Sequence, residues 1–266
     1  MSLVARIARA LGSGKLTLFT GAGFSNEATD HRRVRLPTAR QLRRELWDLC
    51  FPDTKPDEST LADLFHHALR RKPRQLARLV DERLRIDPAS LGPEQERWFA
   101  LPWRRIYTLN VDDLEVAVAE RFALPHTLVP ISALTGGRRR KPRRSTIEVI
   151  HLNGVVEDGP EGITFSTLQY GDRLARRCAF YEELARDLRT HPFLIVGTQL
   201  GEAPLWQHVQ MLARRHGRRR ARGARSWLVA ERLDRARQSL LRELGIEWIR
   251  MSAGRFARDV LSKLPL

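Results

Sequence analysis

The sequence is poor in cysteine, with only Cys50 and Cys178 among its 266 residues. A structural zinc site made mostly of thiolates needs about four ligands, often in close pairs. Two cysteines that lie far apart also make no disulfide framework. The composition therefore argues against a zinc ribbon and against a disulfide-stapled fold, and we expect no bound metal.

Long apolar runs are missing as well. The longest are short, such as FLIV at 193–196, whereas a membrane helix needs roughly 18 apolar residues. The N-terminal stretch 1–15 carries arginines within its apolar part, unlike a secretory signal. Its apolar residues instead fall on one helical face. These features favour a cytoplasmic protein.

Acidic residues are in deficit: 47 lysines and arginines against 31 aspartates and glutamates give a formal charge of +16. Two runs concentrate the excess, GGRRRKPRR at 136–144 and RRHGRRRARGAR at 214–225. Either run could contact nucleic acid through phosphates, or be a solvated basic loop. Neither is interleaved with the aromatic residues that stack on bases, so nucleic-acid binding is possible but not favoured.

What the sequence does contain is an alternation of apolar runs with amphipathic stretches. Eight runs are typical of strands: 15–20, 105–109, 126–130, 146–152, 162–166, 193–198, 226–231 and 246–251. Helical spacing marks 39–51, 60–71, 73–84 and 114–122, and after residue 192 strand and helix alternate, with helices expected within 203–215, 231–244 and 253–264. This order predicts an α/β fold, a Rossmann-like open parallel sheet with helices on both faces. Residues 1–266 form a single predicted domain, with a helical insertion at about 37–103.

The first strand ends in a glycine motif, FTGAGFSNEA at 19–28. After Thr20, Gly21 and Gly23 would let backbone amides approach a pyrophosphate at the start of a helix. The third glycine of the dinucleotide fingerprint is replaced by Asn26, and no Lys-Ser/Thr pair follows. The motif indicates either a phosphate-bearing ligand or a bare turn.

Two further strand ends carry polar or small residues. The strand at 105–109 runs into Asn110, Asp112 and Asp113, of which an aspartate could simply cap the next helix. The strand at 193–198 ends in Gly197-Thr198-Gln199. Ligands bind at the carboxyl ends of strands in open α/β sheets, so we expect a site where these ends meet.

Taken in order, TGAGFS, TLNVDD, HLNG and VGTQL resemble the motifs of sirtuin-like proteins, namely Gly-Ala-Gly-x-Ser, Thr-Gln-Asn-Ile-Asp, a His-Gly element and Gly-Thr-Ser-Leu. The resemblance spans about residues 15–264. Within that family, the sequence is similar in particular to the bacterial sirtuin-like effector domains of anti-phage defence, which hydrolyse NAD⁺ and lack the zinc ribbon. A helical small module and the absence of four cysteines agree with that branch.

The resemblance implies a role for each matching residue. Gly21, Ala22, Gly23, Phe24 and Ser25 would hold the NAD⁺ pyrophosphate and the adjoining ribose. Asn110 and Asp112 would face the nicotinamide ribose, and Gly197, Thr198 and Gln199 would line the adenosine side, although Gln199 replaces the family's serine. Asn110 would be catalytic, because an amide can hold ribose or water at any pH.

The histidine element departs from the family, which has histidine directly before the glycine. Here Asn153 precedes Gly154, and His151 lies two residues earlier. Residues two apart in a strand face the same side, so His151 could be the general base displaced by one pleat. Alternatively, Asn153 occupies the catalytic position and hydrolysis is slow or absent, or His151 is structural. The other histidines, including His66, His67 and His126, match no motif and are expected on the surface or in packing.

The resemblance thus implies an NAD⁺ glycohydrolase that acts as a defence effector, with NAD⁺ as substrate and no metal. Such domains commonly work with a fused or separate sensor or ATPase and in oligomers. Three alternatives stay open: an impaired module that senses NAD⁺ or ADP-ribose, a basic nucleic-acid-binding subunit, and a protein deacylase. The missing zinc ligands and the missing His-Gly pair count against the deacylase.

Overall fold

The computed structural model describes residues 1–135, 145–175, 179–201, 206–207, 210 and 226–265. Both basic runs, 136–144 and 214–225, lie outside the described residues, as do Cys178 and most of the helix expected within 203–215. No helix in the described ranges is long and apolar enough to cross a membrane.

Seven parallel strands form one sheet in the order β3-β4-β2-β1-β5-β6-β7. The strands are β1 Thr17–Thr20, β2 Ile106–Thr108, β3 Thr127–Ser132, β4 Thr146–His151, β5 Phe193–Val196, β6 Ser226–Val229 and β7 Ile246–Ile249. The chain leaves β1 toward β2 on one side and returns with β5 on the other. A crevice at the carboxyl ends of β1 and β5 is where this topology places ligands.

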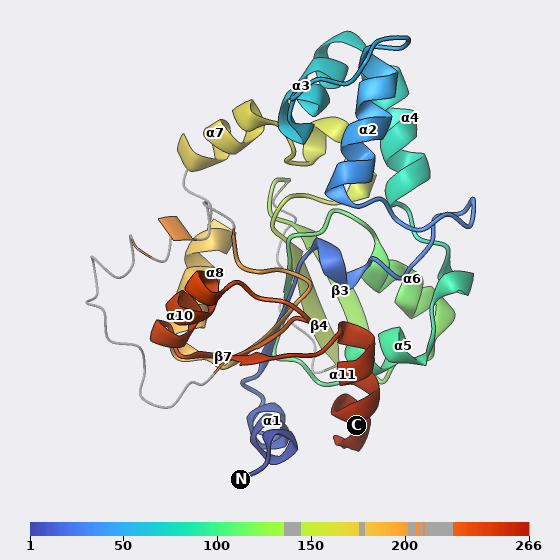
Figure 1. The fold of residues 1–266 in the computed structure, drawn as a ribbon. Coiled ribbons are helices and arrows are strands. Elements are labelled where there is room, and N and C mark those ends of the chain that lie inside the picture. Colours follow the sequence, from blue (N-terminus) through green and yellow to red (C-terminus); the bar gives the residue numbers. More distant parts are fainter. Residues whose placement is uncertain (136–144, 176–178, 202–205, 208–209, 211–225, 266) are drawn as a thin grey trace.

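Side chains alternate between the two faces of the sheet, as a strand's period of two requires. Leu18 and Ile106 pack on one face, with helices α1 Leu3–Gly12, α5 Pro93–Ala100, α6 Leu114–Arg121 and α11 Ala253–Asp259. Phe19 and Tyr107 pack on the other, with α8 Ala179–Thr190 and α10 Arg235–Glu243. The predicted α/β fold with helices on both faces is confirmed (Figure 1).

Between β1 and β2 the chain is largely helical. Three helices, α2 Ala39–Cys50, α3 Leu61–Arg71 and α4 Pro73–Leu84, share a separate apolar cluster and stand above the sheet in Figure 1. Thr38 and Thr60 begin α2 and α3 with capping boxes, and Pro73 begins α4. Helix α5 lies within the predicted insertion but packs on the sheet, so the small module consists of α2–α4.

Buried charge fastens this module to the segment that follows the glycine motif. Asp30 is fully buried, and its carboxylate pairs with the guanidinium of Arg83 on α4. Arg83 Nε also donates to Glu45 Oε2 on α2 at 3.0 Å. Because a buried charge is tolerated only when it is paired, the pairing fixes α2 and α4 relative to the β1–α2 connection.

The prediction of a strand at 162–166, the fifth of the eight, is wrong. Ile163 and Phe165 are part of the apolar cluster of the helical module and do not join the sheet. Ser166 then begins helix α7 Thr167–Ala175: Gln169 N–H donates to Ser166 Oγ at 3.2 Å, and Gln169 Oε1 accepts from Ser166 N–H at 2.9 Å. The apolar composition of this segment serves the module, and its end serves as a helix cap.

Candidate functional site

The glycine motif after β1 packs tightly against the turn after β5. Gly21 N–H donates to Val196 O at 3.0 Å, and Gly23 N–H donates to Gly197 O at 2.9 Å. A Cβ atom at Gly21 would lie 2.6 Å from Thr198 Cβ. Gly197 has a φ of +73°, and a Cβ there would lie 2.4 Å from Phe24 N. These glycines are therefore needed for the close approach of two backbones.

This packing changes how the glycine motif can be tested. The N–H groups of Gly21, Gly23 and Phe24 all donate to carbonyl groups of the protein, so these three are engaged in the present conformation. A Cβ at Gly23 would lie 3.1 Å from Gly197 O, and a Gly23→Val substitution would press on that turn. The role of residues 20–25 in holding a ligand stays a prediction. Loss of binding in Gly23→Val would not test it, because the substitution also distorts the turn at Gly197.

Three of the predicted site residues meet in one hydrogen-bonded cluster. Asn110 Nδ2 donates to Ser25 Oγ at 2.9 Å, and Ser25 Oγ donates to Asp112 Oδ1 at 3.1 Å. The cluster joins the loop after β1 to the loop after β2, and all three side chains are buried. Asn110 Oδ1 is buried without a hydrogen-bond partner in the described part of the chain. An unsatisfied buried acceptor is costly in a native fold, and this one points to a ligand group or a water.

The carboxyl group of Asp112 has an unusual charge state. Burial raises its pKa to about 7, and the nearby Glu115 carboxylate acts in the same direction, against the hydrogen bond from Ser25 and the charge of His151. Burial also raises the pKa of Asp113 to about 6. Asp113 stands at the N-cap position of α6 without capping it, because its Oδ1 accepts from Ile86 N–H at 2.8 Å. The prediction that Asp113 caps the helix is thus wrong. Asp112, with its raised pKa, can exchange a proton near neutral pH.

Replacing Asp112 by asparagine is expected to stabilise the protein at neutral and alkaline pH. An acid whose folded pKa is raised supplies stability below its ordinary pKa of 3.8, and that stability is lost as pH rises to about 7. Asp112→Asn should therefore raise the free energy of unfolding by on the order of 4 kcal/mol at pH 8 and much less at pH 4. Urea unfolding at both pH values measures this, with the exposed Asp48→Asn on α2 as control. An equal effect of Asp112→Asn at the two pH values would contradict the assignment.

The side chain of His151 is enclosed by the protein rather than open to solvent. It is the last residue of β4 and only 1% exposed. Its Nδ1 lies 3.0 Å from Asn110 O, and its Nε2 lies 2.8 Å from Glu115 Oε1 on α6. A backbone carbonyl and an ionised carboxylate are both acceptors, and facing them both ring nitrogens carry protons, as in an imidazolium. Burial alone would lower the pKa of His151, but Glu115 and the Asn110 carbonyl outweigh it and raise the pKa to about 9.

Asn153 lies in different surroundings. The strand ends at His151, so the alternation that would place the two residues on one side does not extend to Asn153. Asn153 Nδ2 donates to Leu109 O at 2.9 Å, and Asn153 Oδ1 accepts from Arg173 Nη1 at 3.0 Å. Arg173, on α7, also donates to Thr164 Oγ1 at 3.1 Å. No pattern in the sequence pointed to Arg173, because an arginine on an amphipathic helix is ordinarily solvated.

A cavity of about 500 Å³ opens beside the glycine motif, at the carboxyl ends of β1, β5, β6 and β7. Its lining includes the predicted residues Gly23, Phe24, Gly197, Thr198 and Gln199. Asn110, Asp112, His151 and Asn153 do not line it. The structure therefore divides the predicted residues between an open cavity and a closed polar cluster, with the loop of Phe24 and Ser25 contributing to both.

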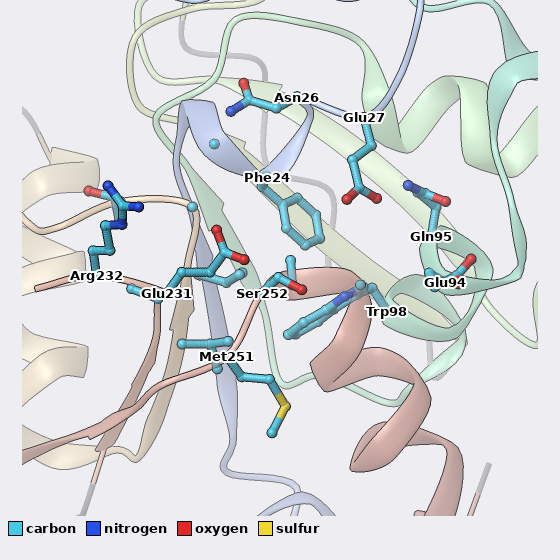
Figure 2. Close-up of a pocket in the computed structure, with 18 of the residues that line it drawn as sticks. Phe24, Asn26, Glu27, Glu94, Gln95, Trp98, Glu231, Arg232, Met251 and Ser252 are labelled. Carbon is cyan, nitrogen blue, oxygen red and sulfur yellow. The ribbon is translucent and has the colours of Figure 1, made fainter.

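The cavity presents an aromatic wall and several carboxylates. Figure 2 shows Phe24 and Trp98 together with the carboxylates of Glu27 and Glu231. Phe24 and Trp98 meet edge to face, with ring centroids 5.3 Å apart. A carboxylate after a strand can accept hydrogen bonds from a ribose diol, which is the chemistry that Glu231, just after β6, can offer. Among the described residues no group of three or more His, Cys, Asp or Glu side chains is placed to hold a metal ion.

An all-parallel sheet with helices on both faces, and a cavity at the carboxyl ends of its central strands, define a Rossmann-like α/β protein. Residues 104–249 match the model of the SIR2-like domain. The match covers more than half of the 266 residues, so the chain belongs to the SIR2-like family. A comparison with curated proteins finds no match.

The matched region contains Asn110, Asp112, His151, Asn153 and the Gly197 turn, but not the glycine motif at 21–25. The structure supplies the missing connection, because Ser25 is hydrogen-bonded to both Asn110 and Asp112. Membership of this family agrees with an NAD-related function.

Proposed function

We propose that this chain binds NAD⁺ and hydrolyses it to ADP-ribose and nicotinamide. The observation that carries the proposal is the buried Asn110 carboxamide: Ser25 holds its nitrogen, and its oxygen has no partner among the described residues. In a SIR2-like domain, an amide oxygen fixed in this way is suited to accept a hydrogen bond from a ribose hydroxyl or from a water molecule.

The residues present suit the parts of an NAD⁺ molecule. A volume of about 500 Å³ lies within the range of small-molecule sites. The adenosine half would occupy this cavity, with Glu231 on the ribose diol and Phe24 and Trp98 as apolar walls. The nicotinamide ribose would lie toward Ser25, Asn110 and Asp112. Several carboxylates line the cavity, and Arg232 is the one arginine in its described lining.

Hydrolysis breaks the bond between the ribose and nicotinamide, and a water molecule supplies the hydroxyl group that replaces nicotinamide. The enzyme must stabilise an electron-poor sugar and accept the proton that the water loses. His151, as an imidazolium, already carries both ring protons and cannot accept another. Asp112, whose pKa is about 7, can accept a proton near neutral pH, while Asn110 orients the ribose or the water.

Incubation of the purified chain with NAD⁺ tests the proposal, with free nicotinamide and ADP-ribose measured by chromatography. Calorimetric titration with ADP-ribose provides a binding measurement that needs no turnover. Nicotinamide release supports the hydrolase. Absence of both release and ADP-ribose binding would overturn the proposal.

A specific observation favours a second candidate, a module that binds NAD⁺ or ADP-ribose without turning it over. Asn153 stands where the resembled family has histidine, and both of its amide atoms are bonded to the protein, to Leu109 and Arg173. Binding of ADP-ribose without nicotinamide release would establish this candidate in place of the hydrolase.

The Asn153→His variant separates the two candidates further. If Asn153 occupies a catalytic position, restoring histidine should raise nicotinamide release by about tenfold or more, because general-base catalysis typically contributes 10²–10⁴-fold. Single-turnover assays of the parent and the variant measure this. An unchanged rate in a variant that still binds ADP-ribose would show that position 153 is not limiting.

The biological setting belongs to the same proposal. We place the chain among the NAD⁺-hydrolysing effectors of anti-phage defence, acting in the cytoplasm with a sensor or ATPase partner and in an oligomer. The support is the order of the four motifs, together with a helical module and only two cysteines. Nucleic-acid contact would depend on the basic runs outside the described residues.

A further inference from the structure

A second cavity, of about 740 Å³, lies between α3 and α7, away from the glycine motif. One wall is the face of α3, and the other is the start of α7, which stands next to α3 at the top of Figure 1. Phe65 of α3 and Phe165, just before α7, hold the two walls together with ring centroids 5.1 Å apart. The capped start of α7 at Ser166 fixes the position of this wall.

Four nitrogen-bearing side chains of α3 line this cavity: His66, His67, Arg70 and Arg71. Residues one turn apart on a helix share a face, so the two histidines lie one turn before the two arginines. Arg70 and Arg71 are exposed, and neither makes an ion pair with any described residue. Their guanidinium groups are therefore available to an anionic ligand in the cavity.

Asp63, the acidic side chain in the described lining of this cavity, is already hydrogen-bonded within the protein. Asp63 Oδ2 accepts a hydrogen bond from Thr60 Oγ1 at 2.6 Å as part of the cap of α3. The hydrogen bonds from Thr60 lower the pKa of Asp63, so the carboxylate is charged, but two arginines outnumber it. The cavity is therefore positive even when both histidines are neutral.

The remaining lining is mixed. Thr167 adds a hydroxyl group, and Leu168 adds an apolar side chain that is 63% exposed. The ring of His67 rests on Phe51, with centroids 4.8 Å apart, which fixes its orientation. Guanidinium groups suit phosphate oxygens, and the volume is of small-molecule size.

We propose that the α3–α7 cavity is a binding site for a small ligand that bears a phosphate or pyrophosphate group, separate from the site at the strand ends. Arg70 and Arg71 bind the phosphate oxygens, His66 and His67 flank them, and Leu168 contacts the rest of the ligand. The proposal does not depend on NAD⁺ hydrolysis, since none of these residues belongs to the Asn110 cluster.

Pyrophosphate added to the full chain is the probe, with the imidazole resonances of His66 and His67 observed by NMR. Both should shift and saturate together. In an Arg70→Gln/Arg71→Gln variant the affinity read from these shifts should fall roughly tenfold or more, because hydrogen bonds to charged groups are lost. The matched control is Arg40→Gln/Arg44→Gln on α2, which removes two exposed arginines that do not line the cavity and should leave the affinity unchanged.

Three results would overturn the proposal. The first is the absence of any shift at His66 and His67 when pyrophosphate is added. The second is an equal loss of affinity in the α2 control, which would indicate non-specific attraction to a basic protein. The third is binding of a single-stranded oligonucleotide, but not of pyrophosphate, through Arg70 and Arg71, which would make this face a nucleic-acid surface.

Discussion

Replacing Asn110 by alanine is expected to lower NAD⁺ turnover by on the order of a hundredfold while leaving the fold intact. The substitution removes the buried carboxamide oxygen that has no partner in the described structure, together with a 2.9 Å hydrogen bond to Ser25. Loss of that bond should cost about 1 kcal/mol of stability, which is small beside the roughly 5–15 kcal/mol that hold a typical protein folded. Single-turnover release of nicotinamide measures the effect.

The control removes a carboxamide from an exposed position away from the site. Gln75 is exposed on α4, so Gln75→Ala should retain the turnover of the parent. Binding of ADP-ribose to the Asn110→Ala variant, measured by calorimetry, shows whether the loss lies in binding or in chemistry. A folded Asn110→Ala variant with undiminished turnover would remove Asn110 from the catalytic assignment.

The sheet and its edge were predictable because each strand is an apolar run that ends at glycine or at polar residues. Parallel strands place their carboxyl ends together, so Ser25 could be expected at one edge with Asn110 and Asp112, from which it is distant in sequence. Their hydrogen bonds agree with that expectation. The segment 162–166 was mispredicted because an apolar run does not reveal whether it packs on a sheet or on a helical module.

The partners of the site residues were not predictable. Glu115 is one of two glutamates on the short helix α6, and such residues are usually solvated, yet it is 3% exposed and its carboxylate meets His151. Arg173 reaches Asn153 from helix α7, which lies further along the chain. The sequence leaves the glycine motif open between a ligand loop and a bare turn, and the contact with Gly197 already requires small residues there. Each of these depends on tertiary contacts, which leave no local pattern.

Replacing Glu115 by alanine is expected to lower the free energy of unfolding by about 3–5 kcal/mol, because it leaves the His151 imidazolium buried without its counter-charge. Nε2 of His151 lies 2.8 Å from Glu115 Oε1, and both side chains are almost fully buried. Urea unfolding at neutral pH measures the loss. If Glu115→Ala and His151→Ala each destabilise the protein but their combination costs much less than the sum, the two residues are coupled.

The charge of His151 gives this prediction a pH signature. Its folded pKa of about 9 lies above the ordinary value of 6.5, so its contribution to stability is fully present below about 6.5 and is lost as pH rises to about 9. The stability of the parent should fall across that window, and the Glu115→Gln variant should show a much smaller fall. The ring resonances of His151 should titrate near pH 9 in the parent and at a lower pH in the variant.

The same titration decides the chemical role of His151. A general base must be unprotonated when it acts, and a ring that donates to both Asn110 O and Glu115 is protonated at neutral pH. His151 would then act as a positioning residue, since its bond to Asn110 O at 3.0 Å holds the loop that presents the Asn110 carboxamide. On this basis Glu115→Gln should lower kcat through Asn110 while the pH profile continues to follow a group that titrates near 7, as Asp112 does. A His151 ring that titrates near 6.5 in the parent, with turnover rising over the same pH range, would make His151 the base and refute the positioning role.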